Sequence, residues 1–133
     1  VSLNAAHEWE GLASCLDYFR VLTREGDDPF SAKLAAAYDE RYSGSVLFTA
    51  GSAATGMYRG LKLWEAAVNE AGNVDRDDVA AALDHAKISE GPGGPAEMVP
   101  GKWHCRMNMY IAVAKAGQYE VISRSPMVDP KEC

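Results

Sequence analysis

The stretch WHCRMNMYIAVAKAGQYEVIS, residues 103–123, carries the clearest strand pattern of this sequence. From residue 107 onward, two sets of side chains alternate: Met107, Met109, Ile111 and Val113 against Asn108, Tyr110, Ala112 and Ala114. A period of two is typical of a β-strand. Ala116-Gly117 supplies a two-residue turn, and Gln118 to Ser123 continues as a second strand. We therefore predict a β-hairpin here.

Irregular segments are expected on both sides of the hairpin. Gly91-Pro92-Gly93-Gly94-Pro95 is a loop, and the tail from Pro126 to Cys133 contains two prolines. The glycines alone suggest a phosphate-binding loop. However, two prolines remove backbone donors and a strand follows where a helix is needed, so phosphate binding is disfavoured.

Three helices are expected upstream. Asp28-Pro29 is a helix start, and Ser43-Gly44 is the corresponding stop. A second helix runs from about Ser52 to Ala71, and a third starts at Asp75. The apolar face of the third helix consists of Val79, Ala82, Leu83 and Ala86.

The first two helices carry aromatic residues at helical spacing. Phe30, Leu34, Tyr38 and Tyr42 recur every four residues, and Met57, Leu61, Trp64 and Val68 form a stripe on the second helix. We interpret the aromatic set of Phe30, Tyr38, Tyr42 and Trp64 as core and not as a ligand cage. Gly56 and Gly60 suggest the close approach of a neighbouring backbone.

The apolar segment from Gly11 to Leu22 fits a strand or a buried helix, and we favour a strand over Ala13–Phe19. This early strand has no obvious partner, because the two later strands pair with each other. The order of strand, three helices and hairpin therefore points to a piece of a larger α/β fold.

Composition narrows the function. The chain has 133 residues, 47% hydrophobic residues and a net charge of -6, so it lacks the basic surface that nucleic acid requires. No apolar run approaches the roughly 20 residues of a membrane span. The odd number of cysteines (Cys15, Cys105 and Cys133) is not a disulfide framework, and we expect reduced or buried thiols.

No catalytic or metal-binding arrangement is found in the sequence. His104 and Cys105 are adjacent and would face opposite sides of a strand, while His7 and His85 are isolated. Carboxylates cluster at the predicted helix starts, where the helix dipole explains them. We therefore expect no enzyme activity, no metal and no cofactor. A small enzyme or interaction domain is the rival hypothesis, and a thiol-dependent activity lost in Cys105→Ala would support it.

Three stretches in order resemble one family. They are DYF with DDPFSAKLAAAYDERYSG (17–19 and 27–44), TGMYRGLKLWEAAVNEAGN (55–73) and ISEGPGGPAEMVPGKWHCRMNMYIAVAKAGQYEVISRSPMVDP (88–130). Together they resemble the C-terminal third of type I periplasmic solute-binding proteins of the branched-chain amino-acid and urea or short-chain amide group. The segment from Gly93 to His104 looks most similar to the urea and amide branch.

The resemblance implies two α/β lobes joined by crossing segments, with the ligand between them. Residues 1–22 would be an interlobe-crossing strand region, residues 23–90 the helical part of the first lobe, and residues 91–133 the terminal hairpin and tail. As a fragment, the chain would expose strand edges and one helix face, and it could self-associate.

The resemblance also implies a function. The parent would be the periplasmic substrate-binding component of an ABC importer, delivering a branched-chain amino acid, urea or a short-chain amide to a permease. The alternative is a cytoplasmic amide-sensing regulator of the same fold. The implied ligand-binding residues are Thr55, Ser52 and Thr49, whereas helix capping is the competing role for Ser52 and Thr49.

Overall fold

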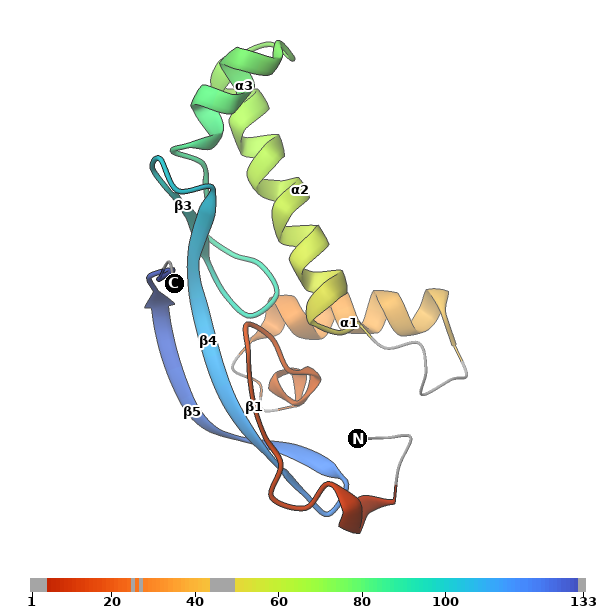
Figure 1. Cartoon of the computed structure of the whole chain (residues 1–133). Coiled ribbons are helices and arrows are strands. Elements are labelled where there is room, and N and C mark those ends of the chain that lie inside the picture. The colour runs from red at the N-terminus through yellow and green to blue at the C-terminus, as the bar shows by residue number, and fades with distance from the viewer. Residues whose placement is uncertain (1–4, 25, 27, 44–49, 132–133) are drawn as a thin grey trace.

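The computed structural model describes residues 5–24, 26, 28–43 and 50–131 and has a mixed α/β fold (Figure 1). The α-helices are α1 (Pro29–Arg41), α2 (Ser52–Ala71) and α3 (Arg76–Leu83). The strands are β1 (Ala13–Leu16), β2 (Lys87–Ile88), β3 (Ala96–Val99), β4 (His104–Lys115) and β5 (Gln118–Val128). Short 3-10 turns, η1 (Ala6–Glu8) and η2 (Arg20–Thr23), flank β1.

Strand β4 is the centre of the antiparallel sheet. One edge of β4 pairs with β5, and the opposite edge pairs with β1 and β3. Ile111 pairs with both β1 and β5, and Met107 pairs with both β3 and β5, so β5 must lie on the other edge of β4 from β1 and β3. Cys15 of β1 lies opposite Ile111, so the expectation that the early strand lacks a partner is wrong. The predicted hairpin is confirmed, with Ala116 and Gly117 both at positive φ in its turn.

The strand boundaries differ from the prediction at three places. Strand β1 ends at Leu16, because Tyr18 and Phe19 turn into the core and η2 follows. The short strands β2 and β3 were missed, since they are too brief to show alternation. The tail is not irregular up to Val128: β5 includes Pro126, which is tolerated because β5 pairs only with β4 among the described residues.

The predicted starts of the three helices and the end of α2 agree with the structure, whereas α1 ends at Arg41, before the predicted stop at Ser43-Gly44, of which Gly44 lies outside the described residues. The Asp28 carboxylate accepts a hydrogen bond from the Ser31 backbone N–H at the start of α1. Gly72 ends α2 at a φ of 70°, and the Asp75 carboxylate caps α3. These local signals depend only on neighbours in the sequence, which is why they could be predicted.

The prediction that the aromatic residues of α1 and α2 form core is wrong within the described residues. Tyr42 and Trp64 are each 51% exposed, while the buried residues of α1 are Ser31 and Ala35. Periodicity identifies an apolar face of a helix but not the face that meets a neighbour. The exposed helix face expected of a fragment is present: Met57, Leu61 and Trp64 are all more than half exposed.

The close backbone approach expected at Gly56 and Gly60 is also absent, since no described atom lies within 4 Å of a Cβ built at either position.

The core has two parts. Tyr18, Phe19, Leu22, Tyr110 and Ala112 form a cluster under the sheet, and the predicted face of α3 packs against Leu63 and Ala67 of α2. In the part of the chain that the structure describes, no helix could span a membrane and no group of three His, Cys, Asp or Glu residues could hold a metal ion.

Candidate functional site

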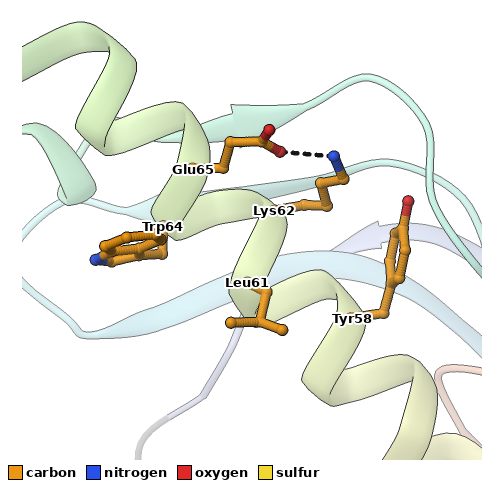
Figure 2. A pocket seen from close by; sticks show the side chains of 5 residues that line it. All are labelled: Tyr58, Leu61, Lys62, Trp64 and Glu65. Carbon is orange, nitrogen blue, oxygen red and sulfur yellow. Dashed lines mark hydrogen bonds and ion pairs between the residues drawn. The ribbon is translucent and has the colours of Figure 1, made fainter. Parts of the chain in front are cut away.

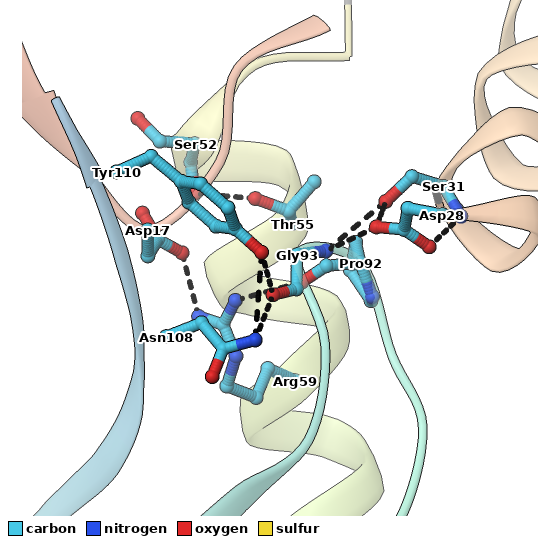
Figure 3. A network of polar contacts seen from close by, with 10 residues as sticks. All are labelled: Asp17, Asp28, Ser31, Ser52, Thr55, Arg59, Pro92, Gly93, Asn108 and Tyr110. Atoms are coloured by element: carbon cyan, nitrogen blue, oxygen red, sulfur yellow. Dashed lines mark hydrogen bonds and ion pairs between the residues drawn. The ribbon is translucent and has the colours of Figure 1, made fainter. Parts of the chain in front are cut away.

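The first turns of α2 lie at a junction of four distant segments. The turn after β1, the start of α1, the loop from Gly91 to Pro95 and the middle of β4 all meet beside this end of α2 (Figure 3). The loop does not lie on the surface as loops usually do. Gly91, Pro92 and Gly93 are buried, and Pro92 is among the most buried residues.

Arg59 ties α2 to this junction. Its side chain is 6% exposed, and Nη1 donates to Asp17 Oδ2 at 2.7 Å. Nη2 donates to the Pro92 carbonyl oxygen at 3.0 Å. One guanidinium therefore joins the turn after β1 to the loop from Gly91 to Pro95. Arginine suits this role, because its planar fork reaches two acceptors at once.

Gly93 is the second anchor of the junction. Its backbone N–H lies 3.0 Å from both Asp28 Oδ2 and Ser31 Oγ at the start of α1. Its carbonyl accepts from Tyr110 Oη at 2.8 Å and from Asn108 Nδ2 at 3.1 Å. Both backbone groups of one buried residue are thus bonded to side chains of other elements, as burial requires.

Glycine is required at position 93 for two reasons. Its φ is 78°, a conformation that residues with a Cβ rarely adopt. A Cβ at this position would also collide with the backbone carbonyl oxygen of Asp17. The loop packs against the turn after β1 and against Tyr110 of β4 with no space for a side chain.

The residues predicted to bind ligand lie next to this junction. Ser52 is half-buried in the first turn of α2. Thr55 is fully buried, and its hydroxyl donates to the Ser52 carbonyl at 3.1 Å. The residue that caps α2 is Gly51, which has no side chain, so the capping role considered for Ser52 is not observed. Thr49 lies outside the described residues.

Arg59 was missed by the sequence analysis. Its row on α2, Thr55, Arg59, Leu63 and Ala67, recurs every four residues and is the buried row of the helix. An arginine spaced with Leu63 and Ala67 was the available signal. Its partners lie 42 and 33 residues away, which no local pattern reveals.

The chemistry of the junction is that of a fixed support. Asp17, Asp28 and Arg59 all have partners, while Arg59 Nε is a buried nitrogen without one. Burial raises the pKa of the Cys105 thiol, although the charge of Arg59 opposes this shift. Cys105 is therefore not activated as a nucleophile. Among the described residues the Cys105 and Cys15 thiols are free, and Cys133 lies outside this part of the chain.

The opposite side of α2 carries shallow depressions. One, of 330 Å³, is lined by Tyr58, Leu61, Lys62, Trp64 and Glu65, with the Lys62 ammonium 2.6 Å from Glu65 (Figure 2). A second, of 320 Å³, shares Tyr58 and Lys62 and extends to Phe30 and Ser89. Phe30 contacts Tyr58 edge to face, with ring centroids 5.6 Å apart.

The comparisons with known proteins point to one family. The sequence profile described as "Periplasmic binding protein" matches residues 2–118. No match to a curated protein was found.

Several solved structures share the fold. A leucine-binding protein from Thermotoga maritima is 17% identical, with a TM-score of 0.68 over 87% of this chain and 31% of that one. A binding protein for leucine, isoleucine, valine, threonine and alanine from Brucella ovis, in a closed conformation, is 15% identical, with a TM-score of 0.74 over 96% of this chain and 35% of that one.

A third structure is an ABC-transporter solute-binding protein from Rhodopseudomonas palustris BisB5, in complex with 3,4-dihydroxybenzoic acid. It is 21% identical, with a TM-score of 0.73 over 91% of this chain and 32% of that one. The present chain spans about a third of the length of each of these proteins. It is a partial domain of the two-lobed fold that they represent.

Proposed function

This chain belongs to the periplasmic binding protein family, and we propose that it is the C-terminal third of the substrate-binding component of an ABC importer. The observation that carries the proposal is the family match over residues 2–118, joined to a fold shared with solute-binding proteins. Capture of a solute needs binding and closure of the protein around it, but no covalent bond is made or broken. The junction beside α2, whose charged side chains are hydrogen-bonded to other parts of the chain, fits that requirement.

The proposed ligand is a small polar solute: a branched-chain amino acid, urea or a short-chain amide. The first turn of α2 supports this choice, because backbone N–H groups at a helix N-terminus suit a carboxylate or carbonyl oxygen. We assign contact with the solute to Ser52 and to Thr49. Thr55 is buried and bonded to Ser52, so we assign it the positioning of that turn. The matched proteins extend the candidates, since their ligands include leucine and benzoates.

The test requires the longer protein that contains this chain. Thermal unfolding is measured with leucine, valine, urea, acetamide and benzoate, each added singly. A solute present at about 100 times its Kd stabilises the folded state by about 2.7 kcal/mol. We expect one of these solutes to raise the melting temperature, and the 133-residue chain alone to show no shift. The absence of a shift with every solute would contradict the proposal.

Ser52→Ala tests the assigned contact. Loss of one hydrogen bond to a charged group weakens binding about tenfold. Ser123→Ala, an exposed serine on β5, is the matched control and should leave the affinity unchanged.

The proposed location is the periplasm and the proposed macromolecular partner is the importer permease. A cytoplasmic amide-sensing regulator of the same fold is the alternative. A secretory signal at the start of the parent reading frame favours transport, and a parent without one favours the regulator.

A further inference from the structure

Arg59 lies beside the turn of α2 that carries the proposed solute contact. Thr55 and Arg59 follow each other at a spacing of four residues in the buried row of α2. Because helical side chains lean toward the N-terminus of the helix, the Arg59 guanidinium covers the turn that precedes its own Cα (Figure 3). Thr55 belongs to that turn, is fully buried and donates to the Ser52 carbonyl oxygen. Arg59 and Ser52 are therefore linked along one side of the helix.

The first turn of α2 has no capping side chain of its own. The residue at the cap is Gly51, and within the described part of the chain no side-chain hydrogen bond closes the start of this helix. At the start of α1, by contrast, the Asp28 carboxylate makes such a bond. The first turn of α2 is held instead from the side of the helix, where Arg59 bonds to Asp17 and to the Pro92 carbonyl oxygen.

Stability alone does not account for an ion pair at this depth. The Arg59 side chain is 6% exposed and that of Asp17 is 16% exposed. Apolar side chains of similar volume often serve a buried position equally well, since charges lose their hydration there. Arg59 Nε has no partner among the described residues, which adds to the cost. The pair supplies direction, because a planar guanidinium with two acceptors fixes the helix relative to both of them.

We propose that Arg59 is a positioning residue: it holds the first turn of α2 in place against Asp17 and Pro92, and thereby sets the affinity for the solute that this turn contacts. The inference rests on the proposed function, which assigns that contact to Ser52. A group that binds a ligand has to be held within about 0.5 Å of its productive position by the side chains around it. Arg59 acts here through the turn and not by contact with the solute.

A double substitution separates positioning from stability. Asp17→Asn with Arg59→Met removes both charges and keeps similar volumes, so we expect the melting temperature of the longer protein to stay within about 3 °C. The first turn loses its anchor, and we expect the Kd for the solute to rise about tenfold, the loss of one well-aligned hydrogen bond. Calorimetric titration measures the Kd, with whichever of leucine, valine, urea, acetamide and benzoate raises the melting temperature of the unsubstituted protein.

Leu63→Ala is the matched control. Leu63 belongs to the same buried row, but it packs in the apolar cluster between α2 and α3. Its truncation leaves a cavity, so the melting temperature should fall by several degrees while the Kd stays unchanged. A double variant that binds as tightly as the unsubstituted protein overturns the inference. An equal rise of the Kd in Leu63→Ala also overturns it, because any loosening of α2 would then weaken binding.

Hydrogen exchange of the solute-free longer protein gives an independent readout. Arg59→Lys is a milder change that keeps the charge but lacks the planar fork that reaches two acceptors. We expect the peptide of residues 52–58 to exchange at least about fivefold faster than in the unsubstituted protein, and the peptide of residues 64–71 to exchange at an unchanged rate. Equal changes in both peptides, or no change in either, contradict the positioning role.

The outcomes keep this inference apart from the proposed function. If no solute binds to the unsubstituted protein, the proposed function fails, and hydrogen exchange still decides whether Arg59 holds the first turn. If a solute binds and the double variant leaves its Kd unchanged, the inference alone is contradicted.

Discussion

Two rows of side chains run along opposite sides of α2 and meet different surroundings. The row of Thr55, Arg59, Leu63 and Ala67 is buried, although it contains a charged and a hydroxyl side chain. The row of Met57, Leu61 and Trp64 is more than half exposed, although it is apolar. Neighbours, and not hydropathy, decide which row is buried. The polar side chains of the buried row are accommodated by hydrogen bonds: the Thr55 hydroxyl donates to the Ser52 carbonyl, and two of the three Arg59 guanidinium nitrogens have acceptors.

The largest effect is expected at Gly93. In Gly93→Ala, the φ of 78° and the collision with the Asp17 carbonyl oxygen act together, and we expect a loss of about 4 kcal/mol of unfolding free energy. Urea denaturation followed by circular dichroism measures it. Gly101→Ala is the matched control: its φ is 74° but nothing lies within 4 Å, so a loss of about 1 kcal/mol is expected. Equal losses would show that the buried loop is not tightly packed.

Arg59→Ala comes next. The substitution leaves the Asp17 carboxylate without its partner in a largely buried position. We therefore expect the free energy of unfolding to fall by about 3 kcal/mol. Lys62→Ala removes the other ion pair of α2, which is 42% and 53% exposed, and should change the stability by less than about 0.5 kcal/mol. Chemical denaturation of both variants in the same buffer measures the two changes in unfolding free energy. Similar small losses in both would mean that Arg59 does not hold the junction.

The junction shows where prediction from the sequence stops. The cap at Asp28, the Gly72 stop and the turn at residues 116–117 were predicted because each depends on residues a few positions away. The pairing of β1 with β4 joins residues nearly a hundred positions apart, so the early strand was taken as unpaired. The ion pair of Arg59 and the bonds of Gly93 are also long-range, and the sequence carries no periodic signal for them.

The candidate ligand residues show the same limit. Ser52 and Thr55 came from a family resemblance, and the structure adds that they share a hydrogen bond at the first turn of α2. The spacing of Arg59 with Leu63 and Ala67 could have marked it as buried, but its bond to the Pro92 carbonyl follows only from the burial of the loop from Gly91 to Pro95.

The smallest effect has the opposite sign. Gly60→Ala replaces a glycine within α2 that meets nothing within 4 Å, so it should stabilise the chain by up to about 1 kcal/mol through helix propensity. Thermal unfolding by circular dichroism checks this. If Gly60→Ala instead destabilises the 133-residue chain, the exposed row already has a neighbour. That result would contradict the claim that only one of the two rows of α2 is buried.

The most direct test of that difference compares one substitution at two positions of α2. Leu63→Ala and Leu61→Ala remove the same atoms from sites two residues apart, one buried and the other 58% exposed. In urea denaturation of the 133-residue chain, we predict a loss of about 3 kcal/mol for Leu63→Ala and less than about 0.5 kcal/mol for Leu61→Ala. Equal losses at the two positions would contradict the account.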